Sequence, residues 1–173
     1  ERAQDLGLRT IDATCPLVAQ VHRRVIRLNK LSYDVLVIGH KGHPEVEGTC
    51  GHAEGAVHVV SSPEEVAQLV VTDPEKVGYV TQTTLSVEDT AEILAAIRKR
   101  FPGIQEPERT DICFATTNRQ KAVQTLAAEV ELLLVVGSKN SSNSNRLKEV
   151  AHNLGIPAYL IDDACEIDLA WLD

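Results

Sequence analysis

The chain has 173 residues, and Asp and Glu outnumber Lys and Arg by 25 to 17, which gives a net charge of −8. This balance argues against a nucleic-acid partner, because no basic stripe is present. No run has the length of a membrane span or the form of a signal peptide, so we expect neither membrane insertion nor secretion. The four cysteines form no C-x-x-C pair, so zinc-finger and thioredoxin patterns are absent. Because no secretory signal is present, we expect the thiols to be reduced and cytoplasmic.

The first part of the chain alternates predicted helices and strands. We expect a short strand end at 10–12, then a helix that begins at Pro16 and carries the apolar stripe Val18, Val21, Val25 and Leu28. Strands are expected at 34–38, 56–60 and 77–80, with a short helix opening at 62–65. Ser86 and Asp89 resemble a capping box for a helix over 87–100.

After a linker at 106–108, elements of the same kinds recur. Helices are expected near 118–128 and 146–154, and strands at 132–136 and 158–161. Strands that alternate with helices indicate parallel, doubly wound α/β units.

This recurrence is an internal repeat. Cys15 and Cys113 each lie 24 residues before a glycine that closes an apolar run, Gly39 and Gly137, and the match continues at an offset of 98 residues. Residues 162–167 match 61–66 at an offset of 101, which indicates a small insertion. One α/β unit therefore occurs twice, and copies packed face to face would bring two thiols and two polar loops to one cleft. The second copy ends before a third strand, and the chain lacks methionine, so we expect it to be a piece of something longer.

Polar loops follow the buried strands in both copies. The serine- and asparagine-rich loop 137–146 opens a helix, where free N–H groups and the helix dipole attract a phosphate or diphosphate. An ordinary helix cap is the alternative. In copy one, His43 and Glu45 could act as donor and proton source, although a solvated charged loop is the alternative. Thr83 or Thr84, after the third strand, could offer a hydroxyl to a ligand.

The thiols also occupy equivalent places. Cys15 and Cys113 lie near helix starts, where the dipole favours thiolate, whereas Cys50 and Cys165 have no equivalent and are interpreted as structural. Two thiolates from separate units could form a disulfide, a metal site or part of an iron–sulfur cluster. The residues alone indicate a dithiol or metal cleft beside an anion site.

Five stretches carry a resemblance to a known family. They are DATCPLV (12–18), GHKGHPEVEG (39–48), TQTTLSV (81–87), DICFATTNRQ (111–120) and VGSKNSSNSNRL (136–147). They resemble the 4-hydroxy-3-methylbut-2-enyl diphosphate reductases, the LytB or IspH family of isoprenoid synthesis. The resemblance implies three related α/β units around a central pocket. Residues 1–13 would end a preceding unit, 14–107 would form a complete middle unit and 108–173 a truncated third unit.

The family also implies a cofactor and a reaction. A [4Fe-4S] cluster would be held by one cysteine from each unit, and Cys15 and Cys113 match two of the three. The reaction removes the hydroxyl of an allylic alcohol diphosphate as water, using two electrons and protons, and gives isopentenyl and dimethylallyl diphosphates. Ferredoxin or flavodoxin fits as the electron donor.

The resemblance assigns roles to the polar residues. Glu45 matches the proton donor, Thr83 the hydroxyl that orients substrate and relays protons, and His43 a ligand near the diphosphate. The diphosphate cradle is matched by Ser141, Ser142 and Asn143. The third cysteine, two histidines and a serine of the family have no counterpart here, so we expect this stretch alone to be inactive. The alternatives are a redox-inactive α/β module that binds phosphate or diphosphate, and a fragment without any ligand.

Overall fold

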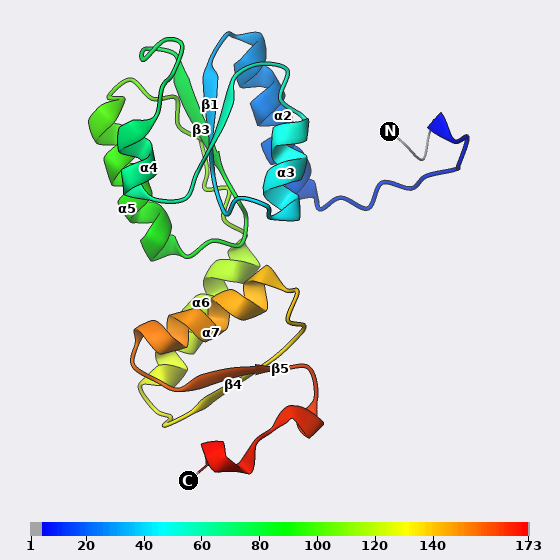
Figure 1. Cartoon of the computed structure of the whole chain (residues 1–173), viewed down its shortest axis with the longest axis vertical. Coiled ribbons are helices and arrows are strands. Elements are labelled where there is room, and N and C mark those ends of the chain that lie inside the picture. The colour runs from blue at the N-terminus through cyan, green and yellow to red at the C-terminus, as the bar shows by residue number, and fades with distance from the viewer. Residues whose placement is uncertain (1–4, 173) are drawn as a thin grey trace.

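The computed structural model describes residues 5–172, which form two parallel β-sheets flanked by helices (Figure 1). The first sheet has the order β2-β1-β3, and the second pairs β4 with β5. All pairings are parallel, which confirms the predicted α/β class of repeated parallel-sheet units. The strands are β1 (Asp34–Ile38), β2 (Val57–Val60), β3 (Val77–Thr81), β4 (Leu133–Val136) and β5 (Ala158–Ile161).

Helices cover both faces of the first sheet (Figure 1). On one face lie α2 (Pro16–Lys30) and α3 (Pro44–Gly51), and on the other lie α4 (Pro63–Gln68) and α5 (Val87–Arg100). The second sheet packs against α6 (Phe114–Ala127) and α7 (Ser142–Asn153), and the chain continues through the 3₁₀ turns η1 (Ala164–Glu166) and η2 (Leu169–Trp171). No helix within residues 5–172 combines the length and apolarity needed to cross a membrane.

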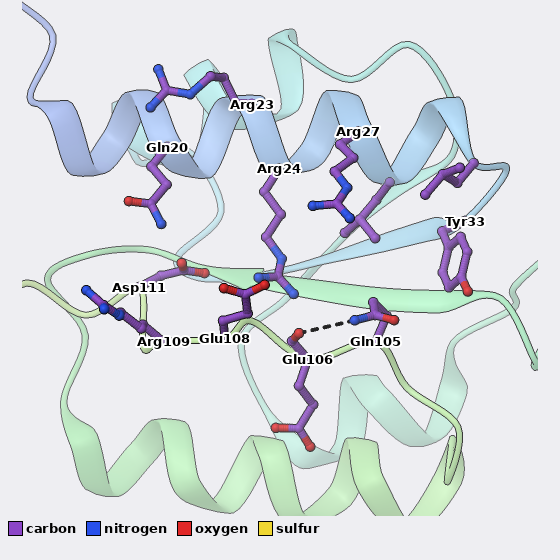
Figure 2. A pocket seen from close by; sticks show the side chains of 12 residues that line it. Gln20, Arg23, Arg24, Arg27, Tyr33, Gln105, Glu106, Glu108, Arg109 and Asp111 are labelled. Atoms are coloured by element: carbon purple, nitrogen blue, oxygen red, sulfur yellow. Dashed lines mark hydrogen bonds between the residues drawn. The ribbon is translucent and has the colours of Figure 1, made fainter.

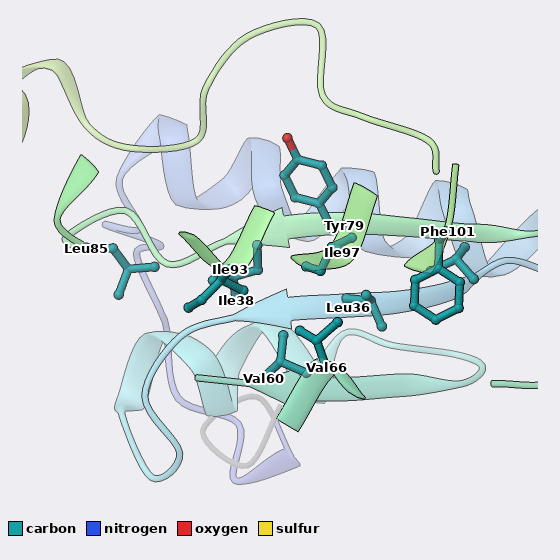
Figure 3. Close-up of a cluster of buried hydrophobic side chains, with 10 residues drawn as sticks. Leu36, Ile38, Val60, Val66, Tyr79, Leu85, Ile93, Ile97 and Phe101 are labelled. Atoms are coloured by element: carbon teal, nitrogen blue, oxygen red, sulfur yellow. The ribbon is translucent and has the colours of Figure 1, made fainter. Parts of the chain in front are cut away.

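Strand β1 is the centre of the hydrophobic core because both of its faces are covered. Leu36 and Ile38 pack into the cluster beneath α4 and α5, which Figure 3 shows, whereas Val35 and Val37 pack into the cluster beneath α2 and α3. Side chains of a strand alternate between faces, so the continuous apolar run supplies two cores at once. The prediction for residues 34–38 is confirmed residue by residue.

Three predicted boundaries were wrong. Residues 8–15 have no regular structure, so the strand end expected at 10–12 is absent. Helix α6 starts at Phe114 rather than near 118, and α7 starts at Ser142 rather than near 146. The first turn of α7 is polar, and α6 begins with Phe114, which is exposed and does not belong to the buried face of the helix, so apolar periodicity marked neither start.

An ion pair repeated in both copies confirms the internal repeat. Lys41 Nζ lies 2.5 Å from Glu65 Oε1, and Lys139 Nζ lies 2.6 Å from Glu166 Oε1. The second oxygen of each glutamate accepts a backbone N–H from the residue four positions earlier, at 2.8 and 3.0 Å. The lysines are 98 residues apart and the glutamates 101, so the same contact spans the predicted insertion.

Two equivalent glycines allow the helix after each strand to approach closely. A Cβ at Gly39 would lie 2.6 Å from Val46 Cγ2 of α3, and one at Gly137 would lie 2.4 Å from Ser144 Oγ of α7. These distances are far below ordinary contact, so any side chain here would push the helix away. The glycines thereby set the position of both polar loops.

Candidate functional site

Glu45 and Thr83 meet because their loops leave neighbouring parallel strands at the same edge of the sheet. His43 caps α3, its Nδ1 accepting the backbone N–H of Glu45 at 3.2 Å, and Pro44 occupies the first helical position. This cap directs Glu45 toward the end of β3. Its carboxylate accepts the Thr83 N–H at 2.7 Å and the Thr83 hydroxyl at 3.0 Å.

The pair can move a proton. Thr83 is buried and Glu45 half-buried, so bulk water has limited access to their contact. The Thr83 oxygen donates to the carboxylate and keeps lone pairs that can accept from a ligand. A carboxyl group joined to a hydroxyl in this way is a suitable donor or acceptor for general acid–base chemistry.

Gln82 ties three loops together and was missed as a site residue. Its Oε1 accepts the backbone N–H of His40 at 3.1 Å, and its Nε2 donates to Thr84 Oγ1 at 2.9 Å and to Ser142 Oγ at 3.3 Å. Thr84 and Ser142 also share a hydrogen bond of 2.9 Å. With 2% of its surface exposed, Gln82 is the buried hub between the polar loops of the two copies. The only sequence signal was its place directly after a buried strand.

The serine–asparagine loop is a helix N-terminus with one unpaired group. Ser141 caps α7, and its oxygen accepts the N–H of Ser144 at 3.2 Å, so the alternative of an ordinary cap holds for this residue. Its own O–H proton is still available to a ligand. Asn143 Oδ1 is buried and has no hydrogen-bond partner among the described residues. Rotating the amide by a half-turn would present its NH₂ group to an anion instead.

Arg146 was also missed, and it fixes α7 against the first unit. This arginine is 9% exposed, and its Nη1 lies 2.7 Å from Asp89 Oδ2. Its Nη2 lies 3.3 Å from Nε2 of His40. Burial, and then the charge of Arg146, lower the pKa of His40, so the ring is neutral and can accept from the guanidinium. The loop after β1 and the first turns of α7 are therefore held together.

The two equivalent thiols lie at equivalent helix starts. Cys15 is the N-cap of α2 and Cys113 that of α6, with backbone angles φ/ψ of −53°/132° and −61°/131°. Neither side chain makes a capping hydrogen bond, so both sulfur atoms are free for another partner. The backbone N–H of Cys113 donates to the Thr83 carbonyl at 2.9 Å, which places this residue beside the Glu45–Thr83 pair. Within residues 5–172, no hydrogen bond joins the Cys15 side chain to that group.

None of the four cysteines forms a disulfide. Cys50 is half-buried against the cluster under α2 and α3, and burial raises the pKa of its thiol, as suits a structural residue. Cys165 is exposed on η1, so the structural place predicted for it is wrong.

The donor set fits part of an iron–sulfur site. Cysteine sulfur is the usual protein ligand of iron–sulfur clusters, and both sulfur atoms are free. In residues 5–172, however, no group of three or more His, Cys, Asp or Glu side chains could hold a metal ion. Cys15 and Cys113 are thus candidate ligands, and the residues 5–172 by themselves do not form a complete metal site.

Comparison with known proteins gives one consistent result. The model of the LytB protein family matches residues 1–173. A 4-hydroxy-3-methylbut-2-enyl diphosphate reductase of Idiomarina loihiensis is 54% identical over 100% of this chain and 56% of its own length. The reductase of Bordetella pertussis is 58% identical over 98% of this chain and 52% of its own length.

Solved structures agree. The E-1-hydroxy-2-methyl-but-2-enyl-4-diphosphate reductase of Plasmodium falciparum superposes with a TM-score of 0.93 at 39% identity, covering 99% of this chain and 54% of that one. A second reductase structure, of the terminal enzyme of the non-mevalonate pathway, gives a TM-score of 0.61 at 35% identity and covers 60% of that chain. The chain thus spans about half the length of the curated relatives it matches.

Proposed function

The chain belongs to the LytB family, and we propose that the protein carrying it is a 4-hydroxy-3-methylbut-2-enyl diphosphate reductase of isoprenoid synthesis. The reaction takes up two electrons and two protons, releases the substrate hydroxyl as water and gives isopentenyl or dimethylallyl diphosphate. One observation carries the proposal beyond the family resemblance. The Glu45–Thr83 proton pair adjoins a free thiol residue, Cys113, and a serine–asparagine helix start.

Cys15 and Cys113 are the proposed iron ligands from this chain. The cluster, when bound, would supply electrons and a Lewis-acidic iron. The third cysteine of the [4Fe-4S] cluster would come from outside residues 1–173. This division of ligands supports the proposal that residues 1–173 by themselves do not turn over substrate.

The polar side chains have separate proposed roles. Glu45 is the proton donor, and Thr83 passes the proton or orients the substrate hydroxyl, because the 3.0 Å bond joins the two groups directly. The diphosphate lies at the start of α7, where the helix dipole and free donors favour its charge, with Ser141, Ser142 and Asn143 as partners. His43 adds a ring nitrogen at the cap of α3.

The domain division and the electron donor belong to the same proposal. Residues 1–13 would end a preceding unit, 14–107 form the middle unit and 108–173 part of a third. A low-potential carrier such as ferredoxin or flavodoxin would deliver electrons in the cytoplasm. The sheet β2-β1-β3 with its four helices supports the extent of the middle unit.

Glu45→Gln in the full-length natural protein tests the proton donor. Glutamine has the shape of glutamate but has no acidic proton to transfer, so we expect turnover to fall by about 100-fold or more while iron content stays unchanged. Glu47→Gln is the matched control, since Glu47 lies two residues further along α3 and is exposed. Activity of Glu45→Gln near that of the control would refute the assignment.

Cys15→Ser tests the cluster separately. We expect bound iron and the brown colour of the anaerobically reconstituted protein to decrease, whereas Cys165→Ser, at an exposed position outside the site, should leave both unchanged. A colourless wild-type protein that still binds diphosphate would favour the redox-inactive binding module. Absence of diphosphate binding altogether would favour a fragment without a ligand.

A further inference from the structure

A concave surface lies on the side of α2 that faces the segment 105–111. It encloses a cavity of about 530 Å³, the size of a small-molecule site. Figure 2 shows Arg24 and Arg27 reaching from α2 toward the segment that carries Glu108, with Arg109 at one end and Tyr33 at the other. No residue proposed above for catalysis, substrate or iron lines this groove.

The groove concentrates positive charge in a chain whose net charge is −8. Four arginines line it, and within residues 5–172 none of their side chains has a hydrogen bond or ion pair: Arg23, Arg24, Arg27 and Arg109. The Nε of Arg24 is buried and also lacks a partner among these residues. A buried donor of a charged group without an acceptor is costly, so an anion from outside would stabilise it.

Within residues 5–172, no carboxylate of the groove forms an ion pair with these four arginines. Glu106 is bound by Arg98, outside the groove, through two hydrogen bonds of 2.7 and 2.8 Å. Asp111 is buried and accepts the Thr81 N–H at 3.1 Å. Burial raises the pKa of Asp111, although the Thr81 N–H and the charge of Arg24 act in the opposite direction. Glu108 is the remaining carboxylate, against four guanidinium groups.

One end of the groove is apolar. Leu31, which is 55% exposed, and Tyr33 follow the last turn of α2, and Leu28 lies beneath them. An exposed leucine beside an aromatic ring offers a surface for a short hydrocarbon group. Arginines at the middle and apolar side chains at the end match a ligand with a charged head and an apolar tail.

The repeat indicates that this face of α2 stays accessible when units pack together. In copy two, Gln120 of α6 packs on the first unit, its Nε2 donating to the Leu85 carbonyl at 3.0 Å. The equivalent of Gln120 on α2, at the offset of 98, is His22. At 100° per residue, Arg24 lies about 200° around the helix from His22, on the opposite side. If a further unit packed on α2 through the side of His22, as α6 packs on the first unit through Gln120, the groove would therefore stay open.

We propose that this groove is a second anion site, which binds a phosphate or diphosphate ester with a short hydrocarbon chain. Guanidinium groups bind phosphate oxygens in pairs, and Arg24 and Arg27 lie three residues apart on one helix face. Isopentenyl diphosphate has the required head and tail. Its identification as a natural ligand rests on the proposed function, whereas binding at the groove does not.

Calorimetric titration of the full-length natural protein with isopentenyl diphosphate tests the proposal. We expect two classes of site, one lost in Asn143→Ala and the other weakened about tenfold or more in Arg24→Gln/Arg27→Gln. Arg119→Gln, an exposed arginine of α6 outside the groove, is the charge-matched control. Should the double variant lose its native circular dichroism, Arg27→Gln alone and Arg24→Lys replace it.

The outcomes are distinct. Binding in Arg24→Gln/Arg27→Gln equal to that in Arg119→Gln would overturn the groove site, and so would complete loss of binding in Asn143→Ala. Inorganic pyrophosphate and isopentenol separate the two halves of the ligand. Pyrophosphate should bind the groove more weakly than isopentenyl diphosphate; equal affinity would eliminate the role of the apolar end. An inactive protein that keeps the groove site would refute the proposed function alone.

Discussion

Replacing Gln82 with leucine should lower both the free energy of unfolding and the affinity of the candidate site for pyrophosphate. The substitution keeps the approximate size of a side chain that is 2% exposed but removes three hydrogen bonds, of 2.9, 3.1 and 3.3 Å. A net hydrogen bond contributes about 1 kcal/mol, and the N–H of His40 would lose its acceptor. Thr84 and Ser142 keep their mutual bond of 2.9 Å, and leucine recovers some apolar contact. The expected loss in the free energy of unfolding is about 2–3 kcal/mol.

Urea unfolding followed by circular dichroism measures this loss. With a slope of about 2 kcal/mol per molar urea, the midpoint should fall by about 1–1.5 M. Gln105→Leu is the control, because Gln105 is exposed and its amide makes only a 3.5 Å contact to the Glu106 carbonyl. Pyrophosphate should also bind more weakly to Gln82→Leu, since Ser142 loses one of its two ties to the first unit. Equal midpoints for the two variants would show that Gln82 is not the hub described above.

Three further changes test other parts of the structure. Gly137→Ala places a Cβ 2.4 Å from a serine hydroxyl of α7 and should destabilise the protein by about 1–3 kcal/mol, whereas Gly51→Ala, with nothing within 4 Å, should not; equal urea midpoints would contradict the close approach. A double-mutant cycle of Arg146→Gln and Asp89→Asn should give a coupling energy of about 0.5–1 kcal/mol, because the aspartate is half exposed; additive losses in the unfolding energy would mean that the pair contributes nothing. Burial alone would raise the pKa of Asp34, but hydrogen bonds from a threonine and a histidine outweigh it and lower the pKa. This stabilisation is complete above the unfolded pKa of about 4 and is lost as pH falls through the lower folded value. The unfolding energies of wild type and Asp34→Asn should therefore converge as pH falls below about 4, and a gap that stays constant with pH would refute the assignment.

Local patterns predicted much of the fold. Three features could be predicted from the sequence: the apolar run of β1, the Ser86 cap of α5 and the repeat offset of 98 residues. The first two depend on neighbours in sequence, and the third on direct comparison of two stretches. The start of α7 was missed because its first turn is polar, and that of α6 because Phe114 is exposed and lies outside the buried face of the helix. The spacing of apolar residues cannot locate a first helical turn that contributes no apolar side chain to the core.

The contacts that assemble the candidate site could not be predicted in this way. Gln82 meets Ser142 across 60 positions, and Arg146 meets His40 across 106. Such pairs depend on how the two units pack, and no periodicity of either segment specifies that packing. The meeting of Glu45 with Thr83 was more accessible, since parallel neighbouring strands bring their carboxyl ends to one edge.

The repeat places different side chains at one equivalent backbone position. His43 and Ser141 cap equivalent helices with their side chains, and the second residue of each helix is Glu45 in one copy and Asn143 in the other. Glu45 has both oxygens satisfied by Thr83, in the loop after β3, whereas Asn143 Oδ1 has no partner within residues 5–172. In the repeat, β4 corresponds to β1, and the partner of Glu45 follows β3, which lies beside β1. We therefore expect a hydrogen-bond donor for Asn143 Oδ1 to come from the corresponding side of β4 or from a bound ligand. A neutral amide at this position, in place of a carboxylate, removes the charge that would repel a diphosphate from the start of α7.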